Sequence, residues 1–522
     1  MKPLFLFLTL TASIEARKFF DDDPLVAEPK SKSIEKAASR KLSDYYDTFS
    51  HLLATPGELA TKAKPIPAQG VNTLGEPMEG AWWVRRHYYE KMSIGDLQRG
   101  PSRGLPPSKE GPWTVIGAKN EGITPGFVIL DAAKRRYFVK FDPLSNPEMA
   151  TGADQISLKL FHALGYHVPD NYLASFTADM LVLGQDVEIA DKVGKKRKMT
   201  SRDVSEILMK VPKSKDGRYR ATASLAIAGK GIGPYRYYGQ RADDPNDIVP
   251  HEHRRDLRGL HVFCAWTAHD DSRSINTYDS LTEEGGAKFV KHYLLDLGST
   301  LGSASSKANS PRSGGEYLFG WKLALKNLLT LGFDVPAWAR AKYSTLPAVG
   351  LFEGDLFDPA TWVPEYPNPA FSNRLPDDDF WAAKQVMAFS DEEIRAIVAT
   401  AEYSDPKVAE FLASAMSKRR DKIGKTYFAK VLPLDNFAVR GGALVFDDLG
   451  ARHKLGPEGG YQVKWHRFDN ETERTEAVNG KDFTPPAIEG YWMGEISHPQ
   501  RAKQTIRVYG RGARVVGVER TW

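Results

Sequence analysis

The sequence predicts a mixed α+β protein with an N-terminal arm and a small β-rich module at its C-terminus. Three patterns support this class. Strand patterns gather between residues 113 and 183, apolar helix patterns follow between 255 and 428, and alternation of apolar and polar residues begins after about 431. The chain has 522 residues, 41% of them apolar and 26% charged. At roughly 150 residues per domain, this allows two or three globular domains and excludes collagen, coiled-coil and globally disordered proteins.

Charge and cysteine content exclude several further classes. The 71 basic and 66 acidic residues give a net charge of +5, a weak bias that does not indicate a dedicated nucleic-acid binder. The single cysteine excludes an intramolecular disulfide and any zinc site built from several thiolates. No apolar run after the first twenty residues approaches the ~20 residues that span a bilayer. We therefore expect neither a nucleic-acid partner nor a transmembrane segment.

The N-terminus has the pattern of a secretory signal. Lys2 precedes a short apolar run from Leu4 to Ala12, and Ala16 offers a cleavage position before a charged stretch begins. We therefore predict that residues 1–16 are a signal peptide and that the protein is exported, to the periplasm or the extracellular space. The alternative is an ordinary N-terminus on a cytoplasmic protein.

The predicted arm covers residues 17–112 and is partly helical. Residues 36–53 have the apolar spacing of an amphipathic helix within polar, proline-containing sequence. Three strands joined by turns follow at 113–117, 126–130 and 137–141. The arm is therefore expected to end where a sheet begins, at about residue 113.

One helix is predicted between two groups of strands. Apolar residues recur at helical spacing over 153–165, and Gly165 is a natural stop. Strands are expected again at 171–176 and 180–183. The helix is thus expected to connect strands of one sheet.

The second half is predicted to be mainly helical before the C-terminal module. Residues 255–269 form a strongly apolar helix pattern. Ser390 opens a capping box, and a further helix begins at Pro406. Strands are expected at 289–295 and, in the module, at 461–466 and 505–508.

Four features that could support phosphate chemistry occur in a fixed order between residues 113 and 298. The first is a turn from Gly117 to Gly126, whose glycines would let backbone N–H groups approach phosphates. The second is Lys140, which interrupts an apolar strand and either extends to the surface or is held inside by an anion. Asp154, near the start of the next helix, is the candidate partner for this lysine.

The third feature is Asp271, followed five positions later by Asn276. Phosphoryl transfer needs a carboxylate near the attacking hydroxyl and an oxygen donor for a metal, and this loop can supply both. Asp271 is preferred to Asp270 because only Asp271 gives the five-position step. The fourth feature is Asp296, which ends an apolar strand just before Gly298 and could bind a divalent cation. The alternative for Asp296 is a strand-ending Asx turn.

In this order, the features resemble the protein-kinase-like superfamily. They look closest to its atypical branches: the HipA-type kinases, the phosphoinositide lipid kinases and the secretory-pathway kinases. In those branches the catalytic segment is Asp-x4-Asn without the usual His-Arg-Asp. The helix that carries the acid continues into Leu-Gly-x-x-Val-Pro, which residues 164–169 match. The resemblance covers about residues 113–300, with the helices to about 428 as an extension.

The resemblance implies a two-lobed protein-kinase-like fold. Residues 113–230 would form the N-lobe and residues 231–430 the helical C-lobe, with the β-rich module at 431–522 outside both. It also implies an ATP- and Mg-dependent phosphotransferase. The acceptor would carry a hydroxyl group on a protein, a sugar or a lipid headgroup.

The resemblance further implies a role for each candidate residue. Lys140 would contact the phosphates of ATP and pair with Asp154, and Asp271 would act as the base or orient the acceptor hydroxyl. Asn276 and Asp296 would hold Mg²⁺. The residues expected to bind the rest of the nucleotide are Gly122 and Gly126 over the phosphates and Gly229, in the segment 226–231, beside the adenine.

Alternatives remain open at this stage. His251 and His253, with the acids at 243–247, could bind a transition metal, or they could form an ion-pair network or a substrate-facing loop. The chain as a whole could be an exported, non-catalytic binding protein on a kinase-like scaffold. The same residues could also transfer AMP instead of phosphate.

Overall fold

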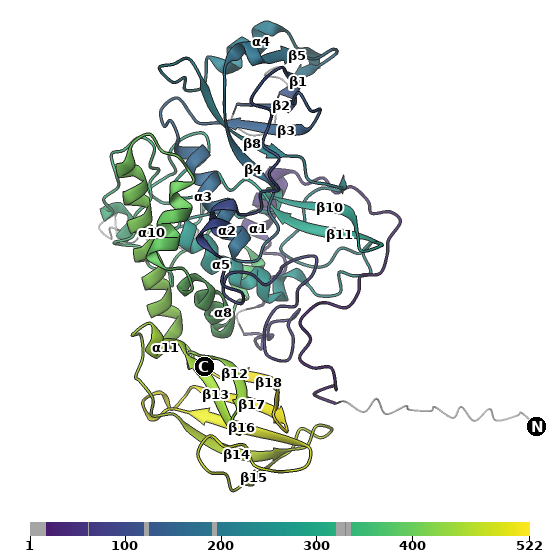
Figure 1. The fold of residues 1–522 in the computed structure, drawn as a ribbon, viewed down its shortest axis with the longest axis vertical. Helices are drawn as coiled ribbons and strands as arrows, with labels where there is room; N and C mark the ends of the chain where they lie inside the picture. The colour runs from purple at the N-terminus through teal and green to yellow at the C-terminus, as the bar shows by residue number, and fades with distance from the viewer. Residues whose placement is uncertain (1–16, 61, 119–124, 191–195, 320–328, 330–335) are drawn as a thin grey trace, which may run out of the picture. The chain divides into compact units, whose positions relative to one another are not determined.

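The structure is a computed structural model that describes residues 17–60, 62–118, 125–190, 196–319, 329 and 336–522. The predicted signal peptide at 1–16 and Gly122 lie outside the described residues. The chain forms two compact units (Figure 1). The larger contains residues 27–71 and 77–429, and the smaller contains the described residues up to 26 together with 72–76 and 430–522. The stretch 17–112 therefore contributes to both units.

A six-stranded sheet with the order β4-β8-β3-β2-β1-β5 forms one part of the larger unit. All neighbours are antiparallel except β1 and β5. Its core contains Trp113, Phe127, Tyr137 and Phe176, with residues of α4 packed against it. The strands and the helix are β1 Trp113–Ala118, β2 Gly126–Leu130, β3 Arg136–Phe141, β4 Asn171–Phe176, β5 Leu181–Leu183, β8 Tyr219–Leu225 and α4 Ser201–Leu208, and a small hairpin is formed by β6 Glu188–Ala190 and β7 Lys196–Lys198. The predicted strands in this region are confirmed.

Helix α3, Met149–Ala163, connects β3 to β4 and begins earlier than predicted. Asp142 accepts hydrogen bonds from the backbone N–H and the hydroxyl of Thr151, both at 2.8 Å, which satisfies a donor in the first turn. Every residue of α3 except His162 is buried. Gly165 follows the C-cap residue Leu164; its φ is +101°, and a Cβ atom there would lie 2.1 Å from the Trp83 indole nitrogen. The predicted stop is therefore confirmed, for both backbone and packing reasons.

The rest of the larger unit is mainly helical and carries a second sheet with the order β11-β10-β9. Ser390 forms the predicted capping box, and Asp405 caps the helix that begins at Pro406. In the described residues, no helix has the length and apolar character needed to cross a membrane. The elements are α1 Asp44–Leu53, α2 Ile94–Arg99, β9 Lys230–Gly231, α5 Arg255–Thr267, β10 Thr277–Glu284, β11 Ala287–Leu294, α7 Pro369–Ser372, α8 Pro376–Met387, α9 Asp391–Ala399 and α10 Pro406–Phe428.

The predicted helix over 36–53 is wrong in its first half, because only residues 44–53 are helical. Ile34 and Ala37 pack instead in a small core formed with β9, β10 and β11. The backbone N–H of Arg40 donates to the carbonyl of Ile232 at 2.7 Å. Contacts with the second sheet thus replace the local hydrogen bonds of a helix.

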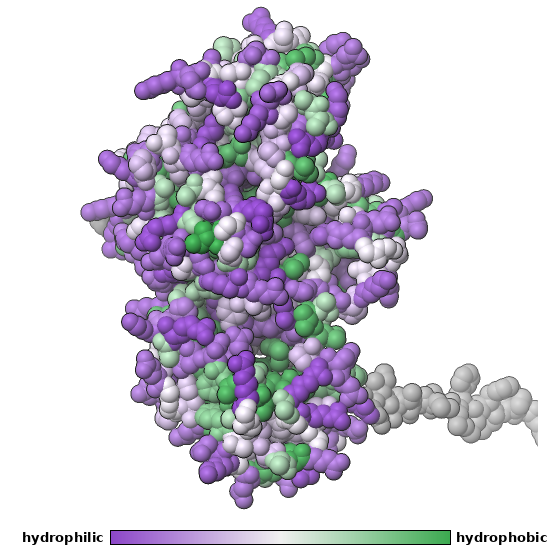
Figure 2. All heavy atoms as spheres, viewed as in Figure 1, coloured by the Kyte–Doolittle hydropathy of each residue, from purple (hydrophilic) through white to green (hydrophobic). Residues whose placement is uncertain are grey.

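The smaller unit contains the predicted C-terminal β-rich module. It is built on an antiparallel sheet with the order β15-β14-β16-β17-β18. Phe19 packs on Phe468, Tyr491 and Tyr509, so the N-terminal residues complete its core. Figure 2 shows a hydrophobic area over this sheet, while hydrophilic side chains cover most of the drawn face of the larger unit. The elements are β12 Leu434–Arg440, β13 Ala443–Asp448, α11 Leu449–Arg452, β14 Gln462–Phe468, β15 Thr475–Val478, β16 Tyr491–Ser497, β17 Thr505–Arg511 and β18 Arg514–Arg520.

Candidate active site

Lys140 lies on β3, in the middle of the six-stranded sheet. It is opposite Gly126 on β2 and Thr222 on β8. Because side chains alternate along a strand, Lys140 and Phe138 share the face opposite the buried Tyr137 and Val139. Its Nζ lies 2.7 Å from Oδ1 of Asp296. The lysine is therefore held by a carboxylate that follows the second sheet and does not extend freely into solvent.

Asp296 and Asn276 lie at the open end of the hairpin formed by β10 and β11. Thr277 pairs with Leu294, and the next backbone N–H, of Leu295, donates to the carbonyl of Asn276 at 2.9 Å. Asp296 has a left-handed backbone, with φ of +56°. The hairpin register therefore brings the two predicted metal ligands to the same edge of the sheet, although twenty positions separate them in the sequence.

Asp154 lies on the buried face of α3, near both Lys140 and the turn after Asp296. It accepts a hydrogen bond of 2.7 Å from Nδ2 of Asn171. A Cβ atom at Gly298 would lie 3.8 Å from the Cβ of Asp154. The ion pair predicted between Lys140 and Asp154 is not formed among these described residues, and the Lys140 ammonium contacts Asp296 instead. Asp154 acts on Lys140 as a neighbouring negative charge.

The pKa values reflect this arrangement of charges. Burial lowers the pKa of Lys140, but Asp296 and Asp154 together raise it above its ordinary value, so Lys140 carries a full charge. Burial raises the pKa of Asp154 to about 6, against the opposing effects of Lys140 and Asn171. Asp154 and Glu365, the latter with a pKa raised by burial to about 7, are thus groups of this site that titrate close to neutral pH.

We predict that activity falls as the pH decreases through about 6, because a protonated Asp154 no longer attracts Lys140. In the folded protein the pKa of Asp154 lies above its ordinary value of 3.8. The contribution of Asp154 to stability is therefore complete below pH 3.8 and is lost as the pH rises through about 6. Lowering the pH from 7 to 5 should therefore reduce kcat/KM without a loss of Tm from this group. Parallel pH profiles of kcat/KM and Tm test this prediction. Activity that stays constant to pH 5, or that falls only together with Tm, would contradict it.

Asp271 follows α5 and contacts the guanidinium of Arg273. Burial raises the pKa of Asp271, and Arg273 opposes this rise. Arg273 also pairs with Asp44 of α1 at 2.9 Å and lies 3.7 Å from Glu365. The amide nitrogen of Asn276 donates to the backbone carbonyl of Asp271 at 2.8 Å, which closes the predicted five-position loop on itself.

Asp270 has a different environment from Asp271. It is buried, and it accepts hydrogen bonds from Asn309 and Ser313. Both donors lie in the segment that follows Gly298, and each bonds a different oxygen of the Asp270 carboxylate. Asp271 is less enclosed, since its side chain is 22% exposed and contacts Arg273.

The donor atoms of Asn276 and Asp296 fit a hard cation. Mg²⁺ prefers carboxylate and amide oxygens. The amide nitrogen of Asn276 is used in its bond to Asp271, so its side-chain oxygen is the atom left for a cation. Asp296 offers the carboxylate, one oxygen of which also contacts Lys140.

The segment 226–229 links the two sheets of the larger unit. Ala226 extends the pairing of β8 with β3, because its backbone N–H donates a hydrogen bond of 3.0 Å to the carbonyl of Arg136. Ser280 of β10 donates to the carbonyl of Ala228 at 2.6 Å, and β9 follows at once. Gly229 has φ of +88°, and a Cβ atom there would lie 2.6 Å from the carbonyl oxygen of Leu281. The segment 226–229 thus connects the six-stranded sheet to the second sheet.

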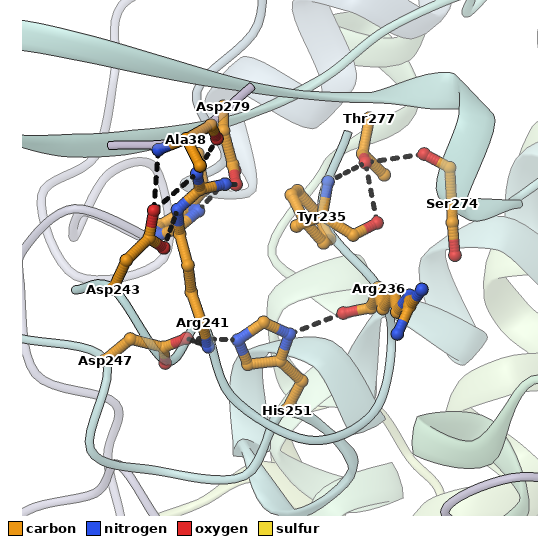
Figure 3. A network of polar contacts seen from close by, with 11 residues as sticks. Ala38, Tyr235, Arg236, Arg241, Asp243, Asp247, His251, Ser274, Thr277 and Asp279 are labelled. Carbon is orange, nitrogen blue, oxygen red and sulfur yellow. Dashed lines mark hydrogen bonds and ion pairs between the residues drawn. The ribbon is translucent and has the colours of Figure 1, made fainter. Parts of the chain in front are cut away.

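The histidine and aspartate cluster at 241–253 forms an ion-pair network (Figure 3). Asp247 accepts a hydrogen bond from His251 at 2.8 Å, and Arg241 contacts both Asp243 and Asp279. His292 meets the other oxygen of Asp279 at 2.7 Å. The described residues include no group of three or more His, Cys, Asp or Glu side chains that could hold a metal. Among the described residues, the ion-pair network is the arrangement formed.

Three residues of the site were not predicted from the sequence. Asn171 lies two residues after Pro169, which ends the Leu-Gly-x-x-Val-Pro motif. Arg273 lies two residues after Asp271. Glu365 is remote in sequence, and burial raises its pKa to about 7 next to Arg273 and Asp271. Arg273 could have been identified from the sequence, because it is a charged residue inside the Asp-x4-Asn segment. No local pattern indicates Glu365.

Comparisons with known proteins give matches in structure alone. No protein-family model matches the chain, and no curated protein sequence does. Among solved structures, the proinflammatory kinase CtkA of Helicobacter pylori matches 63% of this chain and 95% of its own, with 10% identity and a TM-score of 0.31. Golgi casein kinase with Mn/ADP bound matches 65% and 77%, with 9% identity and a TM-score of 0.27.

A second structure of Golgi casein kinase matches 78% of this chain and 96% of its own, with 9% identity and a TM-score of 0.31. These three solved structures are named as kinases. Because the TM-scores do not exceed 0.31, we base the proposed function on the side-chain geometry of this chain.

Proposed function

We propose that this protein is an ATP- and Mg-dependent phosphotransferase acting on a hydroxyl group. The observation that carries the proposal is the convergence of Lys140 and Asp154 with Asp296, Asn276 and Asp271. These residues come from β3, α3, the hairpin end and the loop after α5. The charges of Asp296, Asp154 and Asp271 all act on Lys140. A cluster with one cation among several carboxylates suits a triphosphate bound with a divalent metal.

Each residue has a role in the proposed reaction. Lys140 would bind and orient the phosphates, and Asn276 and Asp296 would hold Mg²⁺. The metal would neutralise charge on the β- and γ-phosphates. The acceptor oxygen would form a bond to the γ-phosphorus, the bond from that phosphorus to the bridging oxygen would break, and ADP would leave. Asp271, whose pKa is raised by burial, would take the hydroxyl proton or orient the hydroxyl.

The sheet face around Lys140 also suits a nucleotide. Phe138 is 41% exposed on this face, and Val128 pairs with it on β2. These side chains offer an apolar surface for an adenine, next to the hinge segment 226–229. The N-terminal pattern favours an exported protein, and we include export in the proposal.

Nucleotide-dependent stabilisation tests the proposal. Mg²⁺-ATP at about 100 times its Kd should stabilise the folded protein by about 2.7 kcal/mol, measured as a rise in Tm. ATP with EDTA should give a smaller shift, because Asn276 and Asp296 would then lack their cation. An exported binding protein without nucleotide chemistry should show no shift with either, and that result would contradict the proposal.

Mass analysis of the product separates phosphoryl from adenylyl transfer. Phosphoryl transfer adds roughly 80 Da to the acceptor, and transfer of AMP adds roughly 329 Da. We expect the smaller increment.

A further inference from the structure

Helix α1 has its apolar side facing solvent. Tyr45, Tyr46, Phe49 and Leu53 are 81%, 73%, 59% and 76% exposed, in that order. Successive residues of a helix are rotated by about 100°, so these four side chains fall within an arc of about 100°. They form one continuous stripe, which we call the α1 stripe.

The opposite side of α1 is polar and buried. Asp47 accepts a hydrogen bond of 2.7 Å from the hydroxyl of Tyr366, and the His51 ring stacks on the Tyr366 ring at 5.3 Å. Asp44 pairs with Arg273, as described above. These contacts fix the rotation of the helix. The α1 stripe therefore cannot turn inward without breaking buried polar contacts, which is costly.

The segment just before α1 carries exposed positive charge. Between residues 30 and 41, Ile34 and Ala37 pack inward against the β9–β11 sheet. Four lysines of the same segment are exposed: Lys30, Lys32, Lys36 and Lys41. Glu35 is the single acidic residue among these twelve positions. The order along the chain is thus a basic segment followed directly by an outward apolar helix face.

We propose that residues 30–53 bind an anionic lipid surface, with the α1 stripe in the interfacial layer and the lysines near the headgroups. Tyrosine suits such a layer because its ring is apolar and its hydroxyl is polar. Several lysines beside an amphipathic helix are typical of segments that bind anionic lipids.

A protein partner fits these observations less well. A stable protein interface buries about 800 Å² on each partner. Four side chains on one ten-residue helix supply only part of that area. A lipid surface needs a shallow apolar insertion and complementary charge, and residues 30–53 offer both.

Lipid binding would place the proposed catalytic loop near a membrane. Asp44 of α1 pairs with Arg273, two residues after Asp271. An acceptor held at the membrane would thus be close to Asp271. The binding itself does not depend on phosphotransfer, so the two can be measured separately.

Sedimentation with lipid vesicles tests the inference. The full-length protein should bind vesicles of phosphatidylcholine mixed with phosphatidylserine, and bind pure phosphatidylcholine much more weakly. The double variant Tyr46→Ser/Phe49→Ser should bind the mixed vesicles about tenfold more weakly. The double variant Lys36→Gln/Lys41→Gln should lose about fivefold for each lysine.

Matched variants elsewhere in the same unit serve as controls. Met209 and Val182 are 70% and 49% exposed, and Met209→Ser/Val182→Ser should bind like the wild type. Lys210→Gln/Lys215→Gln, at two other exposed lysines, should do the same. The inference is overturned if the wild type does not sediment with the mixed vesicles. It is also overturned if the control pairs weaken binding as much as the test pairs, or if only an acidic polypeptide, polyglutamate, binds to residues 30–53.

Discussion

Replacing Asp296 by asparagine should reduce phosphotransfer at least about a thousandfold. The substitution keeps the size of the side chain and removes the negative charge that would bind the cation. It also releases Lys140, whose Nζ is 2.7 Å from this carboxylate. Asparagine suits the experiment better than alanine because Asp296 has φ of +56°, a conformation that asparagine tolerates well. Measurements of kcat, and of Tm with and without Mg²⁺-ATP, check this result.

Asp186→Asn is the matched control for Asp296→Asn. Asp186 also has a left-handed backbone, with φ of +53°, and its side chain is 87% exposed in a pair with Lys198. The same chemical change at that position should leave kcat unchanged. Asp296→Asn with wild-type activity would remove the metal role from Asp296 and, with it, the proposed reaction.

Replacing Lys140 by methionine should lower kcat/KM by about a hundredfold to a thousandfold. Methionine has a similar length and can occupy the same position on β3, but it cannot bind phosphate. Asp154 and Asp296 would lose the positive charge between them, and the pKa of Asp154 would rise further as a result. The Tm shift with Mg²⁺-ATP should become smaller. Lys140→Arg should recover part of the activity, because it restores the charge with a different geometry.

Lys159→Met is the matched control for Lys140→Met. Lys159 is also buried, on α3, and its Nζ donates to Oε1 of Gln155 at 3.1 Å. Burial lowers its pKa to about 8, so its charge is poorly supported. Because Lys159 also lowers the pKa of Asp154, both variants should be compared at pH 8, well above about 6, where methionine at position 159 should preserve activity and Tm. Equal losses from both variants would mean that Lys140 acts through the fold and not on the nucleotide.

Those parts of the candidate site that depend on neighbouring residues could be predicted from the sequence. An apolar strand pattern fixes the position of Lys140 on β3. The segment from Asp271 to Asn276 is a short loop, as predicted, and a hydrogen bond from Asn276 closes it. One hairpin brings Asn276 and Asp296 together over twenty positions. In each case the interacting residues are close to one another in the sequence.

The partner of Lys140 could not be predicted in the same way. Asp154 and Asp296 are both carboxylates within reach of the sheet, and the sequence does not rank them. The choice depends on how α3 and the second sheet pack around β3. In the folded chain Asn171 donates a hydrogen bond to Asp154, and Asp296 is the ion-pair partner of Lys140. The start of α1 was missed for the same reason, because residues 34–40 pair with a sheet that is remote in sequence.

The sequence by itself determined the α+β class, most of the secondary structure and the candidate residues for phosphate and metal. These follow from periodicity and from the chemistry of side chains within short segments. The tertiary structure decided which charges meet, which helix face remains outside and where the N-terminal segment lies. Such outcomes depend on the competition between distant partners for burial and hydrogen bonds, and this competition has no local signature in the sequence.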